Sequence, residues 1–74
     1  TALALAERVA SENPNSYHYV STLAAALAEN GRFPEAIATA TRALELVRAG
    51  NDPTGIKNAE ARLRSYQAGQ PWRQ

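Results

Sequence analysis

The sequence predicts an all-α protein of about four helices that pack as antiparallel hairpins. Alanine, the strongest helix former, is abundant along the 74 residues, whereas valine, isoleucine and aromatic residues are scarce. The four glycines and four prolines fall at or near the ends of the stretches that read as helices. Within these stretches apolar residues recur at a spacing of three and four, which places them on one face of a helix.

The first two predicted helices are separated by a proline-containing turn. The first covers roughly residues 2–12 and stops before Pro14, because a proline disfavours helical geometry in the residue that precedes it. Asn15 or Ser16 is expected to cap the second helix, which ends at the glycine signal Asn30-Gly31.

The third and fourth predicted helices each begin with a proline. Pro34 lies in the first turn of the third helix, where its missing N–H is harmless, and that helix ends at Ala49-Gly50. Asp52-Pro53 opens the fourth helix in the same way, and this helix reaches about Ala68 before Gly69 stops it. Since each connection is short, consecutive helices are expected to run antiparallel.

The chain repeats itself at an offset of thirty-four residues. Leu3 recurs conservatively as Ile37, and the fourth helix matches the second if two extra residues are allowed near residues 50–52. The identical matches between the first and third helices pair Ala2, Ala4, Ala6 and Arg8 with Ala36, Ala38, Ala40 and Arg42. A period of this length is typical of arrays built from helical hairpins.

This hairpin resembles a tetratricopeptide repeat. Residues 31–37, Gly-Arg-Phe-Pro-Glu-Ala-Ile, and residues 42–46, Arg-Ala-Leu-Glu-Leu, carry most of the likeness. The chain departs from the family pattern at Val20, where tryptophan is usual, at Ala40, where an aromatic is usual, and at Arg48, where the closing proline is missing. The resemblance implies a right-handed α-solenoid. The packing positions that it carries over are Val20, Leu23, Ala24, Leu27, Gly31, Phe33, Ala36, Ile37, Ala40, Ala43 and Leu44.

The resemblance also divides the chain, which is expected to form a single domain over residues 1–74. The units are the second helix of a preceding repeat (1–14), one complete repeat (17–50), a modified capping helix (51–68) and a tail (69–74). The polar fourth helix suits a cap, because the end of an array needs a polar outer face. We therefore expect the C-terminal end of a bacterial repeat protein. Trp72 is expected to fold back onto the last helix, and a contact with a partner or a free tail remain the alternatives.

The residues favour no catalytic, cofactor-binding or metal-binding site. The chain has no cysteine, and its single histidine, His18, has no nearby residue in the sequence that would orient it for proton transfer. One histidine cannot supply the several ligands that a metal needs. The loop at residues 50–55 lacks the lysine and spacing of a phosphate-binding loop.

Bulk charge and hydropathy disfavour two classes of partner. The net charge is +1, and the basic C-terminal end lacks the interleaved aromatics that stack on nucleic-acid bases. No apolar run approaches the roughly 20 residues of a membrane span. We expect no nucleic-acid binding, no direct membrane insertion and a soluble domain, in the cytoplasm or the periplasm.

Binding of a protein or peptide in the concave groove is the function that the resemblance implies. By resemblance, the groove positions are His18, Ser21, Thr22, Ala25, Ala28 and Glu29. These positions lack the Lys, Arg and Asn with which some repeats of the family hold a C-terminal carboxylate of chaperones, so that activity is disfavoured.

Two alternatives stay open from the sequence. The first is self-association as a homodimer, because the first helix has lost a neighbour that covers Leu3, Leu5 and Val9. The second is a non-catalytic regulatory tail of an upstream enzyme or membrane protein.

Overall fold

A computed structural model describes residues 2–71, without the side chain of Ala2, and contains four α-helices and no strand in that range. The helices are α1 (Ala2–Glu12), α2 (Tyr17–Glu29), α3 (Phe33–Ala49) and α4 (Pro53–Gln67). The predicted all-α class and the number of helices are confirmed. Trp72 and the rest of the predicted tail beyond residue 71 lie outside the described residues.

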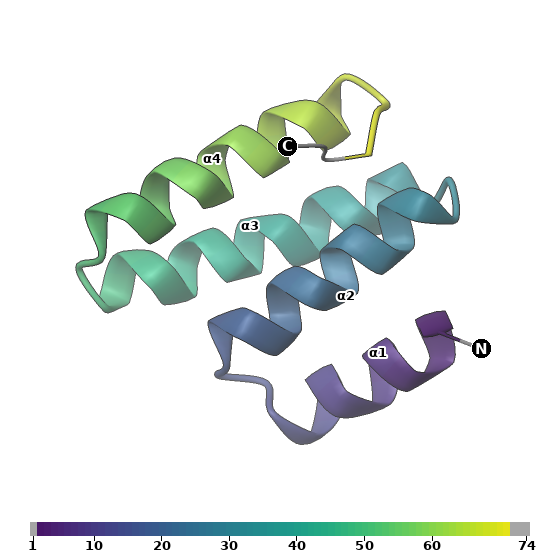
Figure 1. The fold of residues 1–74 in the computed structure, drawn as a ribbon, viewed down its shortest axis with the longest axis horizontal. Coiled ribbons are helices and arrows are strands. Elements are labelled where there is room, and N and C mark those ends of the chain that lie inside the picture. The colour runs from purple at the N-terminus through teal and green to yellow at the C-terminus, as the bar shows by residue number, and fades with distance from the viewer. Residues whose placement is uncertain (1, 72–74) are drawn as a thin grey trace.

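The helices lie side by side in chain order, and successive helices run in opposite directions (Figure 1). α2 packs most extensively against α3, α4 packs on the other side of α3, and α1 packs against α2. Because α1 lies at one edge of this arrangement, one of its flanks has no helix beside it in the described chain (Figure 1).

Two helices end in a glycine with positive φ. Gly31 has φ 76°, its N–H donates to the carbonyl of Ala28, and the N–H of Arg32 donates to the carbonyl of Leu27. The same pair of bonds closes α4 around Gly69, which has φ 75°. This is the Schellman arrangement, in which carbonyls left unpaired by the end of the helix gain donors.

The end of α3 differs from the pattern that its glycine suggests. Gly50 has φ −83°, a right-handed helical value, and the next residue, Asn51, adopts the left-handed conformation with φ 54°. The N–H of Asn51 then donates to the carbonyl of Arg48. Asparagine tolerates this conformation better than most residues, so the helix ends where predicted but through a different residue.

The N-termini of α2, α3 and α4 have no hydrogen bond from a capping side chain. Ser16 and Asp52 occupy the cap positions of α2 and α4, yet neither side chain bonds to the first turn. Pro34 and Pro53 lie at the starts of α3 and α4, where proline removes one unsatisfied N–H.

The core is built mainly from small side chains. One cluster joins α2, α3 and α4 and comprises Ala24, Leu27, Ala28, Ala36, Ala40 and Tyr66, with Leu3, Leu23, Phe33, Ile37 and Leu63 packed against it. A second cluster of Leu44, Val47 and Ala59 lies between α3 and α4. Val20 and Ala43 are also buried. Every predicted packing position thus lies in or beside the core, apart from Gly31, which ends α2.

Candidate interaction surface

The six predicted groove residues do not form one exposed surface. His18, Thr22 and Glu29 are exposed and Ala25 is half-buried, whereas Ser21 and Ala28 are buried. The reason is the helical period: Ser21, Ala24 and Ala28 follow one another at three and four residues, and this stripe of α2 faces the interior. Ser21 and Ala28 are therefore not available to a partner, and the prediction of an exposed groove position is wrong for these two residues.

The hydroxyl groups of this region are engaged within α2. Ser21 Oγ donates to the carbonyl of His18 at 3.2 Å, and Thr22 Oγ1 donates to the same carbonyl at 2.8 Å. Such bonds to the preceding turn satisfy the hydroxyl locally. Ser21 and Thr22 consequently present no free donor for a ligand.

An apolar cleft of about 260 Å³ lies between α1 and α2. We call it the α1–α2 cleft, and it is lined by Leu5, Ala6 and Val9 of α1 and by His18, Tyr19 and Thr22 of α2. Leu5 is 64% exposed and Tyr19 is 39% exposed. These are the two exposed large hydrophobic residues of the described chain, and both lie in this one cleft.

Aromatic contact and helix geometry shape the α2 side of the cleft. The rings of His18 and Tyr19 meet edge to face, with centroids 5.4 Å apart and an interplanar angle of 66°. Edge-to-face contact is one of the preferred geometries of aromatic pairs.

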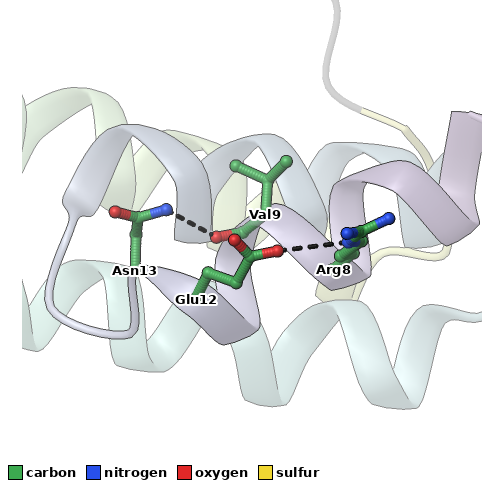
Figure 2. Close-up of polar contacts among 4 residues, drawn as sticks. All are labelled: Arg8, Val9, Glu12 and Asn13. Carbon is green, nitrogen blue, oxygen red and sulfur yellow. Dashed lines mark hydrogen bonds and ion pairs between the residues drawn. The ribbon is translucent and has the colours of Figure 1, made fainter.

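The last turn of α1 is held by polar contacts on its outer side (Figure 2). Asn13 Nδ2 donates to the carbonyl of Val9 at 2.9 Å, which satisfies a carbonyl at the end of the helix. Arg8 Nε lies 3.2 Å from Glu12 Oε1, and both side chains are largely exposed. An exposed pair at this spacing stabilises a helix by only about 0.3–0.5 kcal/mol. The pair therefore adds little to the stability of the fold.

A second cleft, of about 420 Å³, lies on the other flank of α1 beside α3. Its lining is more polar and includes Glu7, Ser11, Thr39 and Arg42. The guanidinium of Arg42 donates to the carbonyl of Pro14 from Nη2 at 2.9 Å and from Nε at 3.3 Å. Arg42 therefore connects the α1–α2 loop to α3. We interpret this cleft as part of the packing between the helices.

A small hollow of about 10 Å³ lies where α2, α3 and α4 meet. Its lining includes Arg62 and Tyr66, and the Tyr66 hydroxyl and Arg62 Nε are buried without a hydrogen-bond partner among the described residues. Burial raises the pKa of Tyr66 above its ordinary value, against a smaller opposing effect of the Arg62 charge. A space this small is comparable with one water molecule, so it is no site for an organic ligand.

The described part of the chain has no clustered metal ligands: no group of three or more His, Cys, Asp or Glu side chains is placed to hold a metal. The described helices are also too short or too polar to cross a membrane.

The sequence pointed to part of the α1–α2 cleft. Leu5 and Val9 were expected to lack cover, and they do line the cleft, but Leu3 packs against the core cluster instead. Tyr19 was not predicted. Its signal was its position outside the apolar stripe of α2, which begins with Tyr17 and Val20 and faces the core.

Comparison with protein-family models, with curated proteins and with solved structures returned no match to this chain.

Proposed function

We propose that this chain is a protein-interaction module that binds a partner protein through the α1–α2 cleft. The observation that carries the proposal is the pairing of Leu5 and Tyr19, the exposed large hydrophobics of the described chain, in one apolar cleft. Isolated exposed apolar residues are common on soluble proteins, whereas the grouping of these two residues in one hollow favours a contact surface. Tyrosine adds an apolar ring with a polar tip, a combination frequent at interfaces.

The chemistry of the lining favours protein over nucleic acid. None of the residues that line the cleft is Lys or Arg, so the cleft has no cation to neutralise a phosphate backbone. We also propose, from the resemblance to tetratricopeptide repeats, that this chain is one part of an array in which helical hairpins stack as a solenoid.

Site-specific crosslinking tests the proposal. A photoreactive amino acid replaces Tyr19 in the protein as it is produced in its own cells, and a matched chain carries it at Thr41, an exposed position of α3 outside the three cavities. We expect a defined protein adduct from position 19 and not from position 41. The purified partner must then bind the unmodified chain and lose affinity for the Leu5→Glu chain. Equal adducts from both positions, or binding indifferent to Leu5→Glu, would refute the proposal.

Self-association is the second candidate, and the same cleft favours it. A two-fold interface places one surface against itself, so a charged surface would repel its copy. The cleft lining contains no Asp, Glu, Lys or Arg. Sedimentation equilibrium decides this alternative: a dimer that Leu5→Glu converts to monomer supports it, and a monomer at high concentration removes it.

A further inference from the structure

Two asparagines end two helices of this chain in the same way. Asn13 directly follows α1, and Asn30 directly follows α2. Each side chain donates from Nδ2 to the carbonyl four residues earlier, at 2.9 Å from Asn13 to Val9 and at 2.8 Å from Asn30 to Ala26. Because these carbonyls lie in the last turn of a helix, the two amides stabilise the two helix ends alike. Asn13 and Asn30 therefore form a matched pair inside one molecule.

The residue after each asparagine makes the two chemically different. Pro14 follows Asn13, and the nitrogen of a proline carries no hydrogen. Gly31 follows Asn30, and its N–H has no Cβ beside it. A backbone nitrogen that loses its proton can attack the side-chain carbonyl carbon of the preceding asparagine and close a five-membered imide ring. This reaction is therefore open to Asn30 and closed to Asn13.

The folded end of α2 holds Asn30 out of the reactive geometry. Ring closure needs the Gly31 nitrogen to lie nearly eclipsed with Cβ of Asn30 about the Cα–C bond. The ψ angle of Asn30 is 9°, so the Gly31 nitrogen is nearly eclipsed with the backbone nitrogen of Asn30 instead. The Gly31 N–H also donates to the carbonyl of Ala28 at 3.0 Å, and the Asn30 amide is bonded to Ala26. The α2 C-cap, residues 30–32, thus protects the site.

Opening of the α2 C-cap releases the site. Rotation about ψ of Asn30 carries the chain away from α2 and breaks the bonds from the N–H of Gly31 to Ala28 and from the N–H of Arg32 to Leu27. Local opening of a helix end costs less free energy than global unfolding. Residues 30–32 are exposed, so water reaches the ring once it has formed.

We propose that Asn30 is a deamidation site whose rate is set by opening of the α2 C-cap. The Gly31 nitrogen gives its proton to solvent and attacks Cγ of Asn30. The Cγ–Nδ2 bond breaks, and the amide nitrogen takes up a proton and leaves as ammonia. Water then opens the ring at either carbonyl, which leaves an aspartate or an isoaspartate. The site lies at the end of α2 away from His18 and Tyr19 of the α1–α2 cleft, so it is independent of the proposed partner.

The product changes the end of α2. A carboxylate at position 30 has no N–H to donate to the Ala26 carbonyl, and it follows Glu29 at the negative end of the helix dipole. An isoaspartate also adds a carbon to the backbone inside the Schellman arrangement. Deamidation therefore weakens the turn between α2 and α3.

Incubation of the full chain at neutral pH tests the proposal, with peptide mapping by mass spectrometry to locate each deamidated residue. A blocked peptide of residues 26–34 gives the rate without the fold, since so short a segment does not hold a helix. We expect modification at Asn30 and none at Asn13, at a rate at least about tenfold below that of the peptide. The control is Asn30→Gln, which should suppress ammonia release because the longer side chain closes the ring poorly.

Urea separates opening of the α2 C-cap from global unfolding. Below the unfolding transition, the logarithm of the deamidation rate should rise with urea in proportion to the surface that opening exposes. We expect a slope well below the m-value of global unfolding, because only the helix end opens. Asn30→Asp, which carries the aspartate product, should unfold at a lower urea concentration than Asn30→Gln.

Four results would overturn the proposal. The first is faster modification at another asparagine than at Asn30, and the second is a folded chain that reacts as fast as the peptide. The third is a slope in urea equal to the full m-value, since global unfolding then sets the rate. The fourth is the absence of product at Asn30 even in urea just below the transition.

Discussion

At the scale of single residues, backbone conformation decides which positions tolerate change. Gly31 requires its glycine because φ is 76°, whereas Gly50 has helical φ and ψ. A methyl group on Gly50 makes only ordinary contacts, with the nearest atom, the carbonyl oxygen of Val47, at 3.6 Å. The sequence marks both glycines as helix ends and does not distinguish them, because the left-handed position after α3 falls to Asn51.

We predict opposite effects for alanine at these two glycines. Gly50→Ala stabilises the fold by about 0.4–1 kcal/mol, because it lowers the entropy of the unfolded chain without strain. Gly31→Ala destabilises it by about 1–2 kcal/mol, the cost of the left-handed conformation for a residue with Cβ. Urea unfolding of the two variants measures both changes. Equal shifts in the same direction would contradict the assigned dihedral angles.

Tyr66 gives a residue-scale prediction about pH. Burial raises the pKa of its phenol above the ordinary 10.0, so above that pH the unfolded state loses its proton before the folded state does. The unfolded state then binds fewer protons, and the free energy of unfolding falls as pH rises. This contribution is fully present below pH 10 and is lost as pH rises through the pKa of the folded state.

The pH prediction is checked by chemical unfolding between pH 8 and 12. We expect a decline above about pH 10 that Tyr66→Phe reduces, because phenylalanine cannot ionise. A titration followed by phenolate absorbance shows whether the ionisation step at the highest pH is missing in that variant. A decline of the same size in Tyr66→Phe would assign the alkaline sensitivity to other groups.

At the scale of helices, the sequence predicted every element, and the helix contacts add what the pattern could not show. The helix bounds follow from proline and glycine punctuation, which acts locally and is visible in the chain. The close approach of α4 to α3 at Gly55 depends on how the two helices pack, which the local sequence does not show. The sequence analysis placed Gly55 in a loop at residues 50–55, yet Gly55 lies buried in the first turn of α4.

Gly55→Ala tests this approach. A Cβ at this position collides with Cγ2 of Val47 and lies 2.8 Å from Oδ2 of Asp52. Alanine favours helix by about 1 kcal/mol over glycine, but forcing an extra carbon into a packed contact costs about 1–3 kcal/mol. We expect a net loss of up to about 2 kcal/mol in the free energy of unfolding, measured by urea titration.

A second substitution makes the Gly55 test decisive. Val47→Ala removes the colliding methyl group, so Gly55→Ala added to that variant should cost less than it does alone. Additive losses in the double variant would place the source of the effect elsewhere.

At the scale of the whole molecule, the exposed apolar surface gathers at one edge. The interior is closed by α2, α3 and α4, whereas among the described residues a helix lies beside α1 on one side only (Figure 1). From the repeat in the sequence we expected Leu5 and Val9 to lack cover, and both residues line the α1–α2 cleft. The repeat alone did not place Tyr19 at the cleft or Ser21 and Ala28 in the interior, because these positions follow from which face of α2 packs against α3 and α4.

The stability of Leu5→Glu follows from this arrangement. Since the Leu5 side chain is 64% exposed, its replacement removes little buried area. We expect the free energy of unfolding to change by no more than about 0.5 kcal/mol, as for ordinary surface positions. Thermal and urea unfolding of the variant measure it. A large loss would mean that Leu5 belongs to the core and that the cleft is closed in solution.

The equilibrium affinity of the crosslinked and purified partner for three chains tests the central claim most directly. The chains are the unmodified protein, Leu5→Glu and the matched surface control Thr41→Glu. If the α1–α2 cleft is the contact surface, Leu5→Glu weakens binding at least about tenfold while the control binds as the unmodified chain does. Equal affinity for all three folded chains would contradict the account.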